Sequence, residues 1–189
     1  VPGTEWPMFS SVYYLWATEA LQKAWEKDHS LAREAPAVYA RDAIEAVTDL
    51  VIDPVHHTWV KTHWGEDYLH RHNLFFRTLL VAALTCHQQL IGDGRHLAML
   101  RDQVDSLSAE LDASPVGLLE DYPNECYPID VFAAIACIRR ADAVLGADHK
   151  AFTDRAIRAF QGRLLDERGL VPFFADWKTG FHDATSRGT

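Results

Sequence analysis

Apolar positions recur along this chain in six stretches whose spacing is that of α-helices. Three stretches are apolar on nearly every side and predict buried helices, whereas three are apolar on one face and predict surface helices. The predicted buried helices span residues 11–27, 74–91 and 129–145, and the predicted surface helices span residues 37–51, 95–111 and 150–165. Because the two kinds alternate, the sequence predicts an all-α fold built from three consecutive helix pairs.

A polar segment that is rich in aromatic and acidic residues precedes each predicted buried helix, and a similar segment follows the last helix. We expect these segments to be loops, with no sheet beyond short ribbons near Gly117 and Gly169. Asn73 is a suitable cap for the helix that follows it, Pro128 suits a first helical turn, and Gly146 suits a helix end.

Alternating buried and one-faced helices are typical of two concentric layers, as in an α/α toroid. Three helix pairs are too few to close such a ring, and the open edges would leave the apolar flanks of the helices near Ser11 and Ile129 uncovered. We therefore expect residues 1–189 to be a single α/α-hairpin domain that is part of a larger toroid. Further residues or a homo-oligomer would complete the ring.

The polar segments would open at one end of the ring, where loops on a rigid scaffold commonly form a site. The sequence places these residues there: Trp6, Trp64, Glu66, Asp67, Tyr68, His70, His72, Glu120, Asp121, Tyr122, Asn124, Glu125, Tyr127, Asp176, Trp177, His182 and Asp183. Among them, we expect the side chains of Glu120, Asp121, Asn124 and His72 to face one shared cavity.

Crowded carboxylates raise one another's pKa, and a protonated carboxyl beside an ionised one suits the acid–base chemistry of lyases, epimerases and glycosidases. The predicted catalytic residues are Glu120, Asp121, Asp67, His72, Tyr122 and Asp183. The predicted substrate-binding residues are Trp6, Trp64, His70, Asn124, Glu125, Tyr127, Trp177 and His182. In the alternative interpretation, the carboxylates are solvated loop charges and the aromatic side chains belong to the core.

The formal net charge of −9 and the absence of a Lys/Arg cluster argue against nucleic acid or an anionic membrane as a partner and favour a neutral or cationic small ligand. No apolar run has the length of a membrane span, so we expect a soluble protein, with the cytoplasm slightly favoured over export. The three cysteines have no C-x-x-C spacing and imply no disulfide framework. His63, His70 and His72 lack a Cys or carboxylate at a metal-ligand spacing, so we predict neither a metal nor an organic cofactor.

Three segments resemble the linalool dehydratase-isomerase family: residues 73–80, residues 112–124 and residues 165–174. The resemblance covers most of the chain from about Trp16 onward. It implies a six-hairpin α/α toroid that acts on monoterpene alcohols without metal or organic cofactor. Glu120 and Ile129 stand where that family has its two working cysteines, Leu79 stands where it has a helix histidine, and Cys126 matches neither thiol. These departures argue against transferring the family's dehydration chemistry.

The sequence therefore favours a lyase or isomerase that acts on a neutral terpenoid-like or polyol substrate by carboxylate, His and Tyr acid–base chemistry. A carbohydrate-active toroid enzyme and a non-catalytic helical-repeat binding module are the alternatives. An enzyme should have a carboxyl with a strongly raised pKa in an enclosed pocket, whereas a binding module should have an open, solvated concavity.

Overall fold

The computed structural model describes residues 3–182, and the secondary structure of this part of the chain is helical, with no strand. Short 3-10 turns join some of the helices, and no helix within residues 3–182 has the length and apolar character needed to cross a membrane. The helices are α1 (Trp6–Lys27), α2 (Pro36–Tyr39), α3 (Arg41–Ile52), α4 (Thr58–Trp64), α5 (Leu74–Leu90), α6 (Leu97–Ala113), α7 (Pro128–Leu145) and α8 (Lys150–Arg163).

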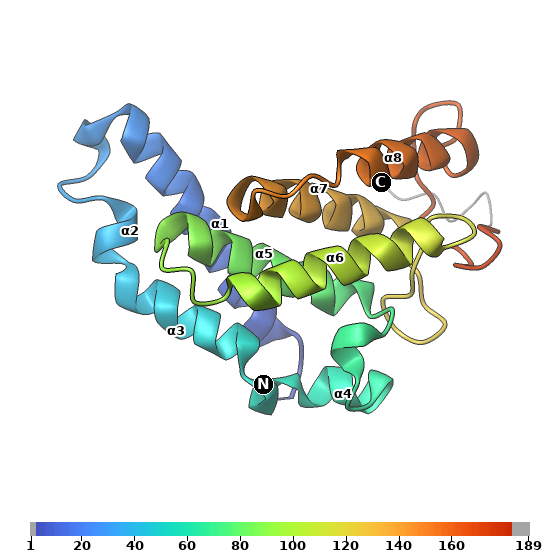
Figure 1. Ribbon diagram of the computed structural model, residues 1–189, viewed down its shortest axis with the longest axis horizontal. Helices are drawn as coiled ribbons and strands as arrows, with labels where there is room; N and C mark the ends of the chain where they lie inside the picture. The colour runs from blue at the N-terminus through green and yellow to red at the C-terminus, as the bar shows by residue number, and fades with distance from the viewer. Residues whose placement is uncertain (1–2, 183–189) are drawn as a thin grey trace.

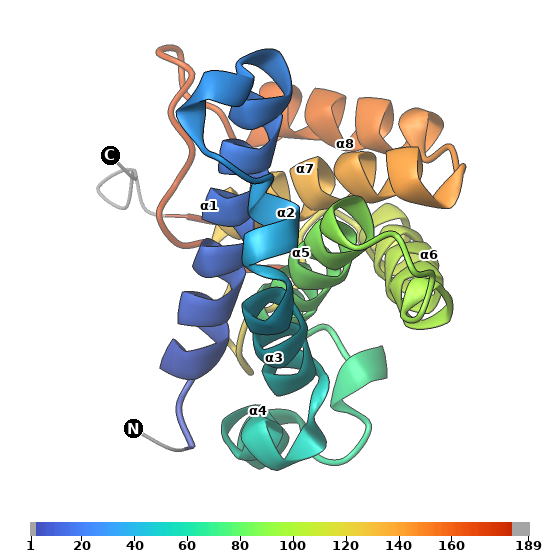
Figure 2. The ribbon, with the colours of Figure 1, turned by 90° about the vertical axis from the view of Figure 1, so that its left-hand side faces the viewer.

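Helix α5 lies at the centre of the fold and packs against α1, α3, α6 and α7 (Figures 1 and 2). Its residues are buried on nearly every side, as its continuous apolar pattern predicts. Helix α1 pairs with α3, α5 with α6, and α7 with α8. Helix α5 is the innermost helix, whereas α1 and α7, also predicted to be buried, each have an exposed face, and α7 packs more closely on α5 than on α8.

Three predicted boundaries are wrong. Helix α1 begins at Trp6 instead of residue 11, because Pro7 fits the first turn, where a backbone N–H has no helical partner. The helix expected over residues 37–51 is divided at Ala40, whose ψ of 7° departs from helical geometry. The loop expected over residues 55–72 contains α4, which forms because Trp59 and Val60 are buried on one of its faces.

The predicted capping role of Asn73 also needs correction. It has a left-handed backbone with φ of 37°, and its side chain makes no capping hydrogen bond. Its Nδ2 instead donates to the carbonyl oxygen of Tyr68 at 2.9 Å, which ties the preceding turn to α5. Within residues 3–182, an isolated bridge joins Tyr122 and Glu125 rather than residues near Gly117. Pro128 and Gly146 begin and end α7 as predicted.

A buried guanidinium links α5 to α6 and to the segment before α5. Arg77 is fully buried, and its nitrogens donate to the side chains of Gln103, Ser106 and Glu110 and to the carbonyl oxygen of Arg71. Each of these bonds is made by a donor that has no access to water, so the network holds the His72 region against α6.

A second polar cluster joins the three inner helices. The buried carboxylate of Glu19 on α1 pairs with Arg140 on α7 and Lys23 on α1, and it accepts a hydrogen bond from the thiol of Cys86 on α5. Burial, followed by the charge of Glu19, raises the pKa of Cys86 to about 12. Cys86 is therefore a structural thiol, as its place in a buried helix predicts.

Several large apolar side chains on the outer faces of α1 and α7 are exposed. Trp6, Tyr13 and Leu21 on α1 and Ile129 on α7 each have more than half of their surface exposed. These are the two helices whose flanks the sequence predicts to be uncovered.

Candidate functional site

The segment Leu118–Tyr127, named here the 118–127 loop, is held in place at both ends and in its middle. Leu118 and Leu119 are buried, and the carbonyl oxygen of Glu120 accepts a hydrogen bond from the backbone of Leu74 at 3.0 Å. Between Asp121 and Glu125 the chain makes a tight turn, with N–H to O distances of 2.8 Å from Asp121 to Glu125 and from Glu125 to Tyr122. The loop is thus held in a fixed position, and its residues line two separate cavities.

On one side of the loop, the carboxylate of Glu120 holds the imidazole of His72. His72 Nδ1 lies 3.0 Å from Glu120 Oε2, and the other oxygen, Oε1, accepts the backbone N–H of Asn124 at 2.7 Å. An ionised Glu120 can only accept this hydrogen bond, in which case Nδ1 donates it and Nε2 is the nitrogen left free. A carboxylate-oriented imidazole is an arrangement suited to general acid–base catalysis.

Two indole rings flank His72. The ring of Trp177 lies 4.4 Å from the imidazole at 83°, and the ring of Trp64 lies 6.4 Å away. A cavity of about 230 Å³ opens beside them and is lined by His72, Glu110, Ala113, Ser114, Pro115, Leu119 and Trp177. This volume is somewhat below the roughly 300–1,000 Å³ of drug-sized sites, so it suits the reacting part of a small molecule.

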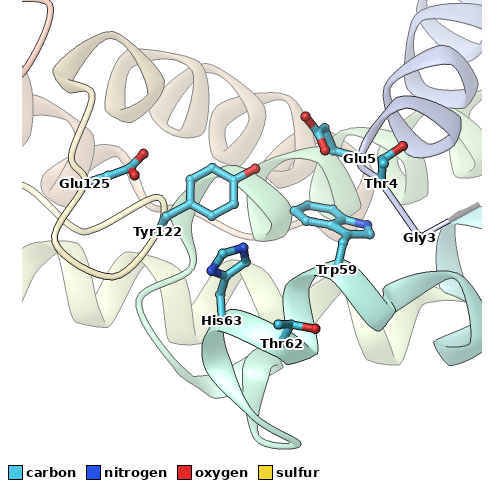
Figure 3. Close-up of a pocket in the computed structure, with 8 residues that line it drawn as sticks. All are labelled: Gly3, Thr4, Glu5, Trp59, Thr62, His63, Tyr122 and Glu125. Carbon is cyan, nitrogen blue, oxygen red and sulfur yellow. The ribbon is translucent and has the colours of Figure 1, made fainter. Parts of the chain in front are cut away.

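On the other side of the loop lies a cavity of about 530 Å³ (Figure 3). Its lining comes from the N-terminal segment (Gly3, Thr4 and Glu5), from α4 (Trp59, Thr62 and His63) and from the loop (Tyr122 and Glu125). The Tyr122 ring lies 5.3 Å from that of His63 and 6.3 Å from that of Trp59. Figure 3 shows the Tyr122 hydroxyl directed toward Trp59 and Glu5.

Burial and negative charge keep Tyr122 protonated. Burial is the largest cause of the raised pKa of the Tyr122 phenol, followed by the charges of Glu5, Asp121 and Glu125. The hydroxyl is therefore a hydrogen-bond donor at any physiological pH.

The turn of the loop conceals a carboxyl that neither cavity reaches. Asp121 is 1% exposed, and its Oδ2 accepts the backbone N–H of Tyr127 at 2.8 Å. Burial and the nearby charge of Asp130 raise the pKa of Asp121 to about 8, and burial raises that of Asp130 to about 6. A carboxyl with a strongly raised pKa is thus present, as the acid–base prediction requires, but it is buried and lines neither cavity.

The predicted shared cavity is not one cavity. His72 lines the smaller cavity with Trp177, and Tyr122 and Glu125 line the larger one. Asn124 lines a third depression with Asp176 and Trp177, and neither Glu120 nor Asp121 lines any of these three. The set is divided because Tyr122 and Glu125 line one cavity, Leu119 and His72 line another, and Asp121 is buried.

Three predicted site residues lie on the outer surface. Asp67 is exposed and lies near the side chains of His70 and Arg71, and His70 also contacts Asp102 on α6. These are solvated pairs, as in the alternative interpretation of the sequence. Trp6 is 63% exposed and packs on Phe9 instead of lining either of the two cavities.

The other predicted binding residues have local roles. The Tyr127 hydroxyl donates to Glu125 Oε2 at 3.0 Å, and the ring packs on Phe173 and Phe174. His182 Nδ1 lies 3.0 Å from the carbonyl oxygen of Gly180. Asp183 lies outside the described residues.

The sequence interpretation missed Glu5, Trp59 and Glu110. The sequence predicts loops before residue 11 and over residues 55–72, whereas α1 begins at Trp6, directly after Glu5, and α4 contains Trp59. The four-residue spacing of Val60 and Trp64, with polar residues between them, is a helical signal for α4. His63 was weighed only as a metal ligand. Within residues 3–182, no group of three or more His, Cys, Asp or Glu side chains has an arrangement that could hold a metal ion.

The chain matches no protein-family model and no curated protein.

Proposed function

We propose that this protein is an acid–base enzyme of the lyase or isomerase type that acts on a small neutral organic substrate beside His72. The observation that carries the proposal is the pairing of His72 with Glu120 at the edge of a cavity that the indole ring of Trp177 lines. The pairing joins two of the predicted catalytic residues across 48 positions of sequence.

His72 Nε2 takes a proton from the substrate in this proposal, and Glu120 stabilises the imidazolium that forms. The proton then returns to a different atom of the same substrate in an isomerase, or to a departing hydroxyl in a lyase. The Asn124 N–H holds the second oxygen of Glu120, so the carboxylate keeps its orientation while His72 changes charge. This second contact makes Glu120 a positioning residue and His72 the catalytic base.

A neutral substrate follows from the charges around the cavity. Glu120 lies behind His72, and Glu110, which lines the cavity, is balanced by its pair with Arg77, so an anion would meet no uncompensated positive charge there. The ring of Trp177 and the side chain of Leu119 offer apolar surface for a terpenoid-like molecule or for the C–H face of a polyol.

One observation favours a non-catalytic binding module as the second candidate. The larger cavity is open to solvent, since Thr62, His63 and Glu125 on its rim are exposed. An open concavity of this kind is what the sequence argument assigned to a binding module.

The α/α toroid and its completion by further helices are part of the same proposal. The helix pairs α1–α3, α5–α6 and α7–α8 support an arc of such a ring. The exposed side chains of Trp6, Tyr13, Leu21 and Ile129 support the covering of both edges by further helices, in a homo-oligomer or a larger toroid. Mass measurement across a concentration series tests the homo-oligomer.

Proton exchange is the most direct test of the reaction class, because it needs no knowledge of the product. The protein is incubated in deuterated water with monoterpene alcohols, polyols and sugars, and mass spectrometry measures deuterium uptake, loss of water and isomerisation. We expect one compound class to react and His72→Gln to slow the reaction by about 10²–10⁴-fold. Glu120→Gln should slow it less, since Nε2 keeps its place.

His56→Gln is the matched control, because His56 is exposed and lines neither cavity. It should react at the wild-type rate. Exchange that survives His72→Gln, or a complete lack of exchange in every compound, would contradict the proposal and leave the binding module.

A further inference from the structure

The larger cavity combines aromatic walls with carboxylates and contains no basic side chain other than an imidazole. Its walls are the rings of Trp59, Tyr122 and His63, and its carboxylates are those of Glu5 and Glu125 (Figure 3). Trp59 is 8% exposed and is fixed from behind by the rings of Phe75 and Phe76. The Trp59 wall is therefore formed before any ligand arrives.

The two carboxylates lack a cationic partner within residues 3–182. Neither Glu5 nor Glu125 forms an ion pair there, although Glu125 accepts a hydrogen bond from Tyr127. Lys61, on the same helix as Trp59, is directed to Glu66 at 2.9 Å and lies over the ring of Tyr68. No Lys or Arg side chain lines the cavity.

Aromatic faces attract cations through their electron-rich surfaces, and ionised carboxylates attract them by charge. Where both line one concavity without an internal cation, a ligand cation supplies the missing charge. A weakly hydrated organic ammonium suits such walls better than a metal ion, which would require several oxygen ligands at short range.

We propose that this cavity binds a small, free organic ammonium compound of the choline type, with the ammonium against the aromatic lining formed by Tyr122, Trp59 and His63 and its charge balanced by Glu5 and Glu125. The Tyr122 hydroxyl, which is kept protonated, donates a hydrogen bond to a hydroxyl or carbonyl oxygen of the ligand. This site is separate from His72 and does not depend on the proposed reaction.

A free ammonium compound is favoured over a phosphocholine headgroup, because a phosphate would face Glu5, Glu125 and the net charge of −9. The cavity volume of about 530 Å³ lies within the range of small-molecule sites and accommodates choline together with a longer substituent.

Calorimetric titration compares choline with 3,3-dimethylbutan-1-ol, a neutral molecule of the same shape. We expect choline to bind at least about tenfold more tightly than the neutral molecule and also more tightly than phosphocholine. Glu5→Gln and Glu125→Gln should each weaken choline binding several-fold without changing the affinity for the neutral molecule. Tyr122→Phe should weaken choline and the neutral molecule by the same factor, because both lose the hydrogen bond from the phenol, whereas Tyr122→Leu should also remove the preference for choline.

Glu34→Gln is the matched control, because it makes the same change of charge at an exposed position outside the cavity. It should bind choline with wild-type affinity. Equal affinity for choline and its neutral counterpart would overturn the proposal, as would equal weakening by Glu34→Gln and Glu5→Gln. Tighter binding of phosphocholine than of choline would also overturn it.

Discussion

The two sides of the 118–127 loop use the same kind of group, a glutamate, in opposite ways. Glu120 is satisfied within the protein by His72 and the backbone of Asn124. Glu5 and Glu125 face aromatic rings and have no internal cation within residues 3–182. A carboxylate with a protein partner can tune that partner's chemistry, whereas a carboxylate without one selects the charge of a ligand. The two proposed roles therefore differ in the partner of the carboxylate, which is His72 for Glu120 and a ligand cation for Glu5 and Glu125.

Arg77, which binds Glu110 and the backbone next to His72, should have a large effect on the His72 side of this comparison. We expect Arg77→Met to lower the free energy of unfolding by about 3 kcal/mol, because it removes donors from Gln103, Ser106, Glu110 and a backbone carbonyl in a buried region. Chemical denaturation measures the change. Arg155→Met, which breaks an exposed pair with Asp112, should cost less than about 1 kcal/mol. Equal losses for both variants would show that the buried network adds nothing.

Asp121, which lies between the two sides, should make stability depend on pH. Its folded-state pKa is raised from 3.8 to about 8, so the unfolded chain loses its proton first as the pH rises. Stability due to the protonated carboxyl is thus full below about pH 4 and is lost progressively up to about pH 8, by about 1 kcal/mol per pH unit. Denaturation at several pH values should show a flatter profile for Asp121→Asn.

Asp49→Asn is the control for that profile, because Asp49 is exposed on α3. A slope unchanged by Asp121→Asn would mean that Asp121 is ionised in the folded protein. Part of the slope below pH 6 should persist in the variant, since burial also raises the pKa of Asp130 to about 6.

The smallest effect should be that of salt. Because the rim of the larger cavity is open, its carboxylates are exposed to screening, and choline affinity should fall a few-fold between about 20 and 500 mM salt. Affinity for the neutral 3,3-dimethylbutan-1-ol should not fall. Titrations at both salt concentrations measure the effect, and equal salt dependence for both ligands would remove the electrostatic part of the argument.

Much of the fold follows from local patterns. The continuous apolar run of α5 and the glycine after α7 predict a buried helix and a helix end, because burial and a left-handed backbone depend on the residues themselves. Helix α4 was missed because it is short and only two of its residues are buried. The toroid is a statement about packing between distant elements, which periodicity does not determine.

The site was predicted less well than the fold because side-chain direction depends on helix boundaries. Glu5 and Trp6 are neighbours, yet Glu5 lines a cavity and Trp6 points outward. One position of an α-helix turns a side chain by about 100°, so an error in the start of α1 exchanges the two. Glu120 and His72 were both predicted as catalytic, but their contact spans 48 positions and no local rule gives it.

The central claim is that the 118–127 loop separates the His72 site from the cavity of Glu5 and Glu125. Its most direct test is a double-mutant cycle that measures choline affinity with His72→Gln and Glu5→Gln. If the loop separates two sites, His72→Gln leaves the affinity within about twofold of wild type, and the double variant binds like Glu5→Gln alone. If His72→Gln weakens choline as strongly as Glu5→Gln, and the two effects are not additive, the residues share one site and the division by the loop is wrong.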